Sequence, residues 1–241
     1  MWNGSILKSN ARVALSGRYW VSFLVTSILV ILSGGVNLIL PDFIVKFPFH
    51  KWSEVWSVTP FFFAWHIHFG WLDFLYVIFL VHPLVIGVSR YFVRNHYEFT
   101  PVETMFSGFQ WDYLNGVAVM FLTQLFIILW SLLFIIPGIV KLVQYSMVPF
   151  LLSDNPSLPG ERARQISRQM TDGQKGKIFL FWLSFLGWFL LGALCFGVGI
   201  LFVLPYFAAS QTELYLCLRD RALSLGFVRP EELCLTPPGR V

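Results

Sequence analysis

The sequence predicts an all-α polytopic membrane protein with six transmembrane helices, and three observations lead to this fold class. The chain of 241 residues is 56% hydrophobic and only 12% charged, which leaves too few polar side chains to coat a water-soluble domain. Two apolar stretches, 115–153 and 177–218, are each about twice as long as one crossing requires. The basic residues gather in the gaps between apolar runs, as is typical of membrane orientation. We therefore expect the lipid bilayer as the main partner and exclude nucleic acid, which a clustered basic face would indicate.

The N-terminal part is predicted to hold an amphipathic helix and the first two crossings. Residues 5–17 place most of their apolar side chains on one side of a helical wheel, which indicates a short helix on the inner membrane surface. The first crossing covers 19–40; it is too long for the core of a signal peptide and lacks a cleavage site, so we expect it to be retained. An aromatic-rich segment follows, and the second crossing is predicted at 71–93.

Each of the two long apolar stretches is predicted to fold as a hairpin of two short helices. Pro137 and Gly138 stand at the centre of the first stretch, and Gly197 and Gly199 at the centre of the second. Such residues end helices and form tight turns. The two hairpins also resemble one another, which either a parallel repeat or coincidence between leucine-rich stretches explains. The resulting crossings are 115–136, 139–153, 177–194 and 200–218.

The distribution of Lys and Arg favours six crossings over four. With six crossings and both termini in the cytoplasm, every Lys and Arg lies on the cytoplasmic side except Lys46, Lys51 and Lys141. If each long stretch crossed only once, the linker 154–176 would be exported with its basic residues, which contradicts the positive-inside rule. The predicted organisation is a single membrane domain at 1–221.

The linker between the hairpins is expected to form a second amphipathic helix at about 160–171. Its apolar face is narrow and its arginines surround the rest, so it either lies on anionic inner-leaflet lipid or is solvated against the neighbouring crossings. Docking of a membrane protein partner is a third interpretation. Residues 222–241 are predicted to form a short cytoplasmic tail.

Prolines recur in the crossings that run inward. Pro83, Pro149 and Pro205 each fall in such a crossing, where proline removes a backbone hydrogen bond and breaks or kinks the helix. Three kinked helices around one centre suit a cavity, but proline also serves in membrane helices to fix their packing.

A few polar residues inside the predicted crossings are candidates for function. Lys141 lies close to a predicted outer turn, so its ammonium can reach the surface. Gln144 and Tyr145 share its helix face and complete a polar strip that either anchors the helix or binds an anionic head group. Arg90 and Glu213 fall toward the cytoplasmic ends of their crossings, where we expect them either to pair or to reach interfacial water separately.

The sequence contains no recognisable catalytic or metal-binding pattern. His66 and His68 would point in different directions on a helix, and the aromatic residues around them fit an interfacial belt better than a metal site. Cys195, Cys217 and Cys234 are expected at different levels and lack the spacing of metal ligands. No zinc-protease, serine-hydrolase or phosphate-loop motif is present. We therefore expect no cofactor, no metal and no enzymatic activity.

Several short motifs between residues 14 and 220 are more specific than composition. They include Pro83-Leu84-x-x-Gly87-x-x-Arg90 in the second crossing, Phe106-Ser107-Gly108-Phe109 before the third, Trp130-Ser131-Leu132-Leu133 and Ile136-Pro137-Gly138-Ile139-Val140-Lys141 in the first hairpin, and Asp154-Asn155-Pro156 after it. Together they resemble the bacterial multi-pass membrane proteins grouped as domain of unknown function 975. The resemblance implies a six-helix α fold in the bacterial cytoplasmic membrane, and it implies no particular activity.

Three functional hypotheses follow from the sequence. The first is a non-enzymatic membrane protein that binds or handles an amphiphilic, lipid-like ligand or accompanies a transport or envelope system. The second is a structural partner subunit of a membrane complex, and the third is a membrane enzyme. A cavity beside Lys141, Gln144 and Tyr145 would favour the first hypothesis, whereas a closed bundle would favour the second.

Overall fold

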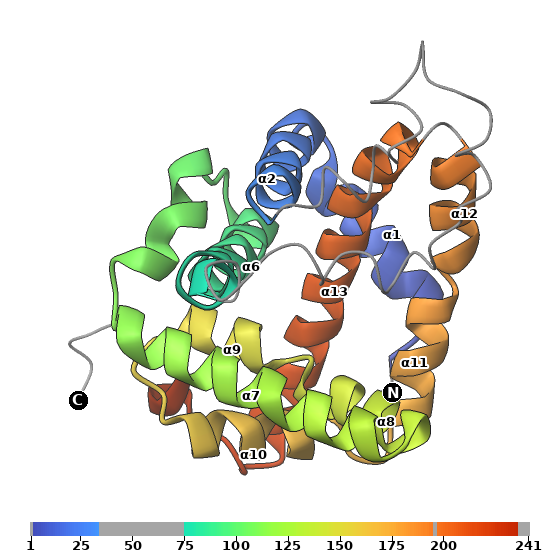
Figure 1. Ribbon diagram of the computed structural model, residues 1–241. Coiled ribbons are helices and arrows are strands. Elements are labelled where there is room, and N and C mark those ends of the chain that lie inside the picture. The colour runs from blue at the N-terminus through green and yellow to red at the C-terminus, as the bar shows by residue number, and fades with distance from the viewer. Residues whose placement is uncertain (1, 34–74, 195–196, 236–241) are drawn as a thin grey trace, which may run out of the picture.

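The computed structural model describes residues 2–33, 75–194 and 197–235, and every regular element in these ranges is a helix (Figure 1). The predicted all-α class is therefore confirmed for the described residues. The aromatic-rich segment with His66 and His68, and also Cys195, lie outside these ranges. The elements are α1 (Gly4–Leu15), α2 (Tyr19–Leu32), the π-helix η2 (Val77–Val81), α6 (His82–Tyr97), the 3-10 helix η3 (Val102–Phe109), α7 (Tyr113–Leu133), α8 (Ile135–Tyr145), α9 (Val148–Asp154), α10 (Gly160–Thr171), α11 (Lys175–Leu183), α12 (Leu186–Leu194), α13 (Val198–Ser224) and the 3-10 helix η4 (Pro230–Leu233).

Five helical stretches of the described chain are long and apolar enough to cross a membrane. They correspond to η2 with α6, α7, α8 with α9, α11 with α12, and α13. The pair α1 and α2 passes the same test only together and is bent by 102°. Length and composition thus support five or six crossings within the described ranges, as expected of an integral membrane protein.

The first hairpin turns at Phe134 and not at Pro137 and Gly138 as predicted. Phe134 is extended, with φ −156° and ψ 144°, and separates α7 from α8. Pro137 falls in the first turn of α8, where a backbone N–H has no intrahelical partner to lose. Gly138 lies so close to α7 that a Cβ atom there would be 2.3 Å from Ser131 Oγ. Both residues therefore permit the close hairpin without forming its turn.

The second hairpin places its glycines in different roles. Gly197 has φ 78° and directly precedes α13, a left-handed conformation that glycine adopts readily. Gly199 already lies in the first turn of α13. Gly192 of α12 faces this turn, and a Cβ atom on it would be 2.9 Å from the carbonyl carbon of Gly199. The glycines at this end thus serve both the turn and the close contact between α12 and α13.

The three prolines of the predicted inward crossings do not act alike. Pro83 lies where the π-helix η2 changes to α6, and Pro149 lies in the first turn of α9, after the break between α8 and α9. Pro205 is inside α13, which continues through it. Pro205 therefore does not end the helix, and α13, which packs against both α1 and α12, continues past it.

Helix α1 lies along the middle of its neighbours and not beneath their ends. Trp2, which precedes α1, contacts α11, where its ring packs edge to face with that of Phe181 at 6.0 Å. Further along, Arg12 lies over the ring of Tyr206 in α13, and Tyr19 of α2 donates a hydrogen bond to the Phe202 carbonyl. The predicted position of α1 on the inner membrane surface stays a prediction, and the structure shows that the helix packs against α13.

Helix η3 packs lengthwise on α6 through two glycines. A Cβ atom on Gly87 would lie 1.8 Å from the Met105 carbonyl oxygen, and one on Gly108 would lie 2.0 Å from the Pro83 carbonyl oxygen. Small residues at such positions let two backbones approach closely. The motif around Gly87 and the motif around Gly108 are separate in the sequence. In the structure they form one interlocked unit of α6 and η3.

Candidate functional site

Arg90 joins α6 to the C-terminal end of α9. Its Nε donates to the Ser153 carbonyl at 2.8 Å, and its two terminal nitrogens donate to the Leu152 and Ser107 carbonyls at 3.5 Å. Leu152 and Ser153 belong to the last turn of α9, where carbonyls lack intrahelical partners and the helix dipole is negative. The buried guanidinium therefore caps α9 and ties it to α6 and η3.

A second buried group connects the same helices to α13. Asp154 Oδ2 accepts hydrogen bonds from Arg219 at 3.0 Å and from the Tyr215 hydroxyl at 2.6 Å. Arg219 also donates to the Tyr97 hydroxyl at 2.9 Å. The side chains of Asp154 and Arg219 are each only 7% exposed, and a buried ion pair persists only when further hydrogen bonds support it. This group and Arg90 form a structural junction.

The predicted pair between Arg90 and Glu213 is wrong. Glu213 instead lies 2.5 Å from Nδ1 of His96, measured from its Oε1. His96 follows Arg90 by six residues, which rotates it by about 240° around α6. Arg90 consequently faces α9 and η3, whereas His96 faces α13.

A hollow of about 320 Å³ lies between α8 and α10. Tyr145 is the α8 residue in its lining, and the Ser167 hydroxyl of α10 donates to the Gln144 carbonyl at 2.6 Å. This hydrogen bond holds α10 alongside α8. The α10 residues of the lining are Glu161, Arg164, Gln165 and Arg168.

Lys141 of α8 does not line this hollow but lies beside Tyr145, which does. Its ammonium lies 4.9 Å from the ring centroid of Trp130 and 5.7 Å from that of Tyr145. The positively charged side chains of Arg168 and Lys175 are close enough to repel it electrostatically. The predicted outer position of Lys141 stays a prediction, and the structure adds that α10 folds back along α8 and brings Arg168 near Lys141.

Gln144 does not line the hollow as the predicted polar strip requires. Its side chain is 5% exposed, and its Oε1 is buried without a hydrogen-bond partner among the described residues. The lining residues of α10 were not predicted as a site. The signal was present in the sequence, since Glu161, Arg164, Gln165 and Arg168 recur at the i, i+3, i+4, i+7 spacing of one helix face.

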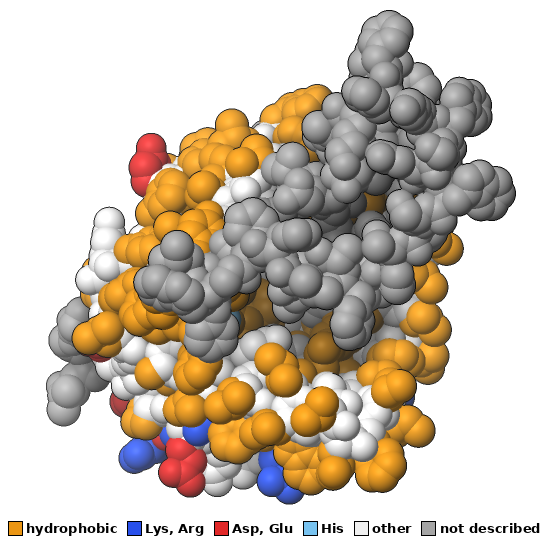
Figure 2. All heavy atoms as spheres, in the orientation of Figure 1, with side chains coloured by type: hydrophobic (Ala, Val, Ile, Leu, Met, Phe, Trp, Pro, Cys, Tyr) orange, Lys and Arg blue, Asp and Glu red, His pale blue; other side chains and the backbone are white. Residues whose placement is uncertain are grey.

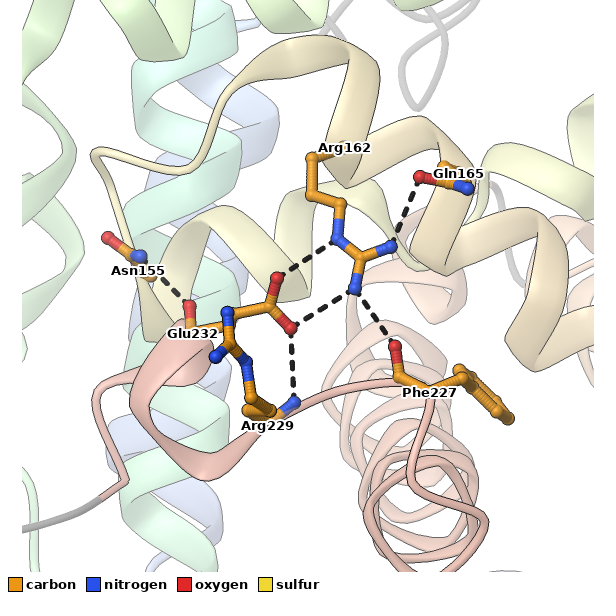
Figure 3. Close-up of polar contacts among 6 residues, drawn as sticks. All are labelled: Asn155, Arg162, Gln165, Phe227, Arg229 and Glu232. Atoms are coloured by element: carbon orange, nitrogen blue, oxygen red, sulfur yellow. Dashed lines mark hydrogen bonds and ion pairs between the residues drawn. The ribbon is translucent and has the colours of Figure 1, made fainter.

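A C-terminal strap, residues 227–235, holds α10 in place (Figure 3). Arg162 of α10 donates from Nε and Nη2 to the two carboxylate oxygens of Glu232 at 3.0 and 3.1 Å, and to the Phe227 carbonyl at 2.9 Å. Asn155, before α10, donates to the Glu232 carbonyl at 2.9 Å. The hydrogen bonds from Arg162 lower the pKa of the Glu232 carboxyl below its usual value. Part of the predicted cytoplasmic tail is thus folded against the membrane domain.

No group of three or more His, Cys, Asp or Glu side chains in the described ranges is placed to hold a metal ion.

A family model described as "Protein of unknown function (DUF975)" matches residues 71–222. Neither a search of curated proteins nor a search of solved structures found a match to the chain. The matched range contains the interlocked α6–η3 unit, the junction of Arg90 and Asp154, and the hollow between α8 and α10. The chain therefore belongs to the DUF975 family.

Proposed function

We propose that this protein is a non-enzymatic protein of the bacterial cytoplasmic membrane that binds an amphiphile with an anionic head group. The head group occupies the hollow between α8 and α10, and the apolar part lies against the neighbouring hydrophobic surface of α7 and α8. This proposal combines Tyr145 of α8 with the basic face of α10.

The charge of the hollow is the observation that supports the proposal best. Arg164 and Arg168 line it, and Lys141 lies beside it over the ring of Tyr145. None of the three cations forms an ion pair among the described residues. Nη1 of Arg164 is buried and has no hydrogen-bond partner within those residues. Glu161 is the single carboxylate of the lining. An anionic group would supply the missing acceptors, and guanidinium groups bind carboxylates and phosphates strongly.

The surroundings of the hollow fit an amphiphile better than a soluble anion. The hollow lies at the Tyr145 end of α8. The opposite end of the helix, about 15 Å away, is strongly apolar, with Ile135 and the adjoining Leu132 of α7 78% and 85% exposed. Figure 2 shows hydrophobic side chains over the lower right of the view, where α7 and α8 meet in Figure 1. The volume of about 320 Å³ is at the lower end for ligand sites, which suits a head group.

Lipid retention tests this function. The full chain is placed in nanodiscs of phosphatidylcholine with or without phosphatidylglycerol, and bound lipid is counted by native mass spectrometry. Each basic residue near an anionic lipid contributes about 1 kcal/mol, so we expect the double variant Arg164→Gln, Arg168→Gln, which loses about 2 kcal/mol, to bind phosphatidylglycerol about thirtyfold more weakly.

The matched control removes one exposed charge elsewhere. Arg221→Gln, at the end of α13, should retain phosphatidylglycerol as the unmodified protein does. If the double variant also retains it, while both variants unfold at the original temperature, the hollow is not the head-group site.

A further inference from the structure

Two basic side chains of α1, Lys8 and Arg12, contact residues of the α11–α12 segment and of α13. Lys8 donates to the Ser184 hydroxyl at 2.7 Å and lies 4.3 Å from the ring centroid of Phe185. Arg12 lies one turn later, with its Cζ 5.5 Å from the ring centroid of Tyr206. Neither cation forms an ion pair with a carboxylate in the described part of the chain.

Arg12 forms part of the wall of a second hollow, of about 490 Å³. The Tyr19 hydroxyl is satisfied by the Phe202 carbonyl at 2.9 Å. The Tyr206 hydroxyl, in contrast, is buried without a hydrogen-bond partner among the described residues. Apart from Arg12 and the two tyrosines, the described lining is apolar or aromatic: Leu15, Trp188, Phe202 and Val203.

The depth of Arg12 makes an unpaired charge costly. Tyr206, over which it lies, is eight residues from the start of α13, or about 12 Å along the helix axis. Since α13 is long and apolar enough to cross a membrane, this level falls within the apolar part of the bilayer. Charged side chains at such depth are expensive and usually meet a partner. The described chain offers Arg12 none, so a ligand is the natural source of the anion.

We infer that this hollow binds a single-chain amphiphile with a carboxylate head, such as a long-chain fatty acid. The carboxylate accepts hydrogen bonds from the Arg12 guanidinium, whose planar donors match it, and from the Tyr206 hydroxyl. The chain lies over Leu15, Trp188 and Phe202. One cation and one hydroxyl suit a single negative charge, and the volume lies within the range of small-molecule sites. The site is separate from the hollow between α8 and α10.

Direct binding of radiolabelled palmitate to the full chain in detergent tests the site. We expect Arg12→Gln to raise the Kd about tenfold or more, because a charge-assisted hydrogen bond is lost. Tyr206→Phe should raise it severalfold. Arg221→Gln, which removes a remote charge, should leave the Kd unchanged, and the three variants should unfold near the original temperature.

A comparison of ligands on the unmodified protein keeps the test decisive even if Arg12→Gln does not fold. Palmitate should displace the labelled ligand at least tenfold more effectively than its uncharged methyl ester does. Equal displacement by acid and ester, or an unchanged Kd for a folded Arg12→Gln protein, would overturn the inference. Phosphatidylglycerol retention at the α8–α10 hollow should not change in Arg12→Gln, so the two sites can fail independently.

Discussion

At the scale of single residues, the close contact between α6 and η3 depends on the absence of a Cβ atom at Gly87 and Gly108. The atoms that a Cβ would meet at both positions are backbone carbonyl oxygens, which cannot rotate away as the end of a side chain can. Added atoms would therefore force the helices apart. Because Arg90 reaches the Ser107 carbonyl across this contact, the spacing also decides whether η3 takes part in the Arg90 junction.

We predict that Gly108→Ala lowers the free energy of unfolding by about 2–3 kcal/mol, as overpacking does in well-packed interiors. Thermal unfolding of the purified protein in detergent measures the change. Gly176→Ala is the matched control, since an added Cβ there meets no atom within 4 Å, and it should be neutral or slightly stabilising. Similar melting temperatures for the two variants would show that η3 can move away at little cost.

At the scale of elements, α10 depends on contacts at both of its ends. The Ser167 hydroxyl fixes it to α8, and Arg162 fixes it to the C-terminal strap. Val228 and Leu233 of the strap are buried, so the strap also covers apolar surface. The strap therefore helps to hold the basic face of α10 over the hollow.

The Arg162–Glu232 pair should make the free energy of unfolding of the protein depend on pH. The pKa of Glu232 is lowered in the folded state, so its contribution to stability is complete above the pKa of the unfolded carboxyl, about 4.3. It is lost as the pH falls through the lower folded pKa. We expect Glu232→Gln to cost up to about 1 kcal/mol at pH 7, as a partly exposed ion pair does. The difference from the unmodified protein should vanish below the folded pKa.

Urea unfolding at a series of pH values from neutral to strongly acidic measures this difference. Glu231→Gln is the control, because Glu231 is exposed and forms no ion pair among the described residues. A constant cost of Glu232→Gln across the whole series would mean that the carboxylate charge does not matter to the strap.

The elements themselves were accessible from the sequence, whereas their packing was not. The helix predicted at about 160–171 is α10, Gly160–Thr171, because Pro159 and the spacing of Ala163, Ile166 and Met170 define it locally. Its course along α8 depends on Ser167 and on the strap, which no periodicity reveals. The partner of Arg90 was missed for a similar reason, since the carbonyls that it binds belong to backbone and carry no residue signature.

At the scale of the whole molecule, the packing of α10 along α8 changes which basic residues lie together. The positive-inside rule separates Lys141 from Arg168 only if α8 crosses the membrane away from α10. In the structure the two cations lie close enough for their charges to interact, Arg168 in the lining of the hollow and Lys141 beside it. The basic residues of the two elements therefore form one electrostatic surface.

We predict that single cysteines at positions 141 and 168 are labelled from the same side of the membrane. A membrane-impermeant maleimide is applied to right-side-out and inverted vesicles, in a background without the native cysteines. A protein that keeps only Cys234, which is exposed in the strap, provides the reference for the side of the strap. Labelling of the two positions from opposite sides would contradict this prediction and show that the membrane separates them, as the positive-inside rule predicts.

The long-range packing of α1 has a consequence for assembly. Lys8 and Ser184, which form a hydrogen bond, are 176 residues apart in the sequence. During synthesis α1 is made before α13, against which it makes its most extensive contact. Contacts of such separation form late because a long loop must close first. The wall that carries Arg12 therefore joins the rest of its hollow late, and the hollow cannot hold a ligand before α13 has been made and α1 has packed on it.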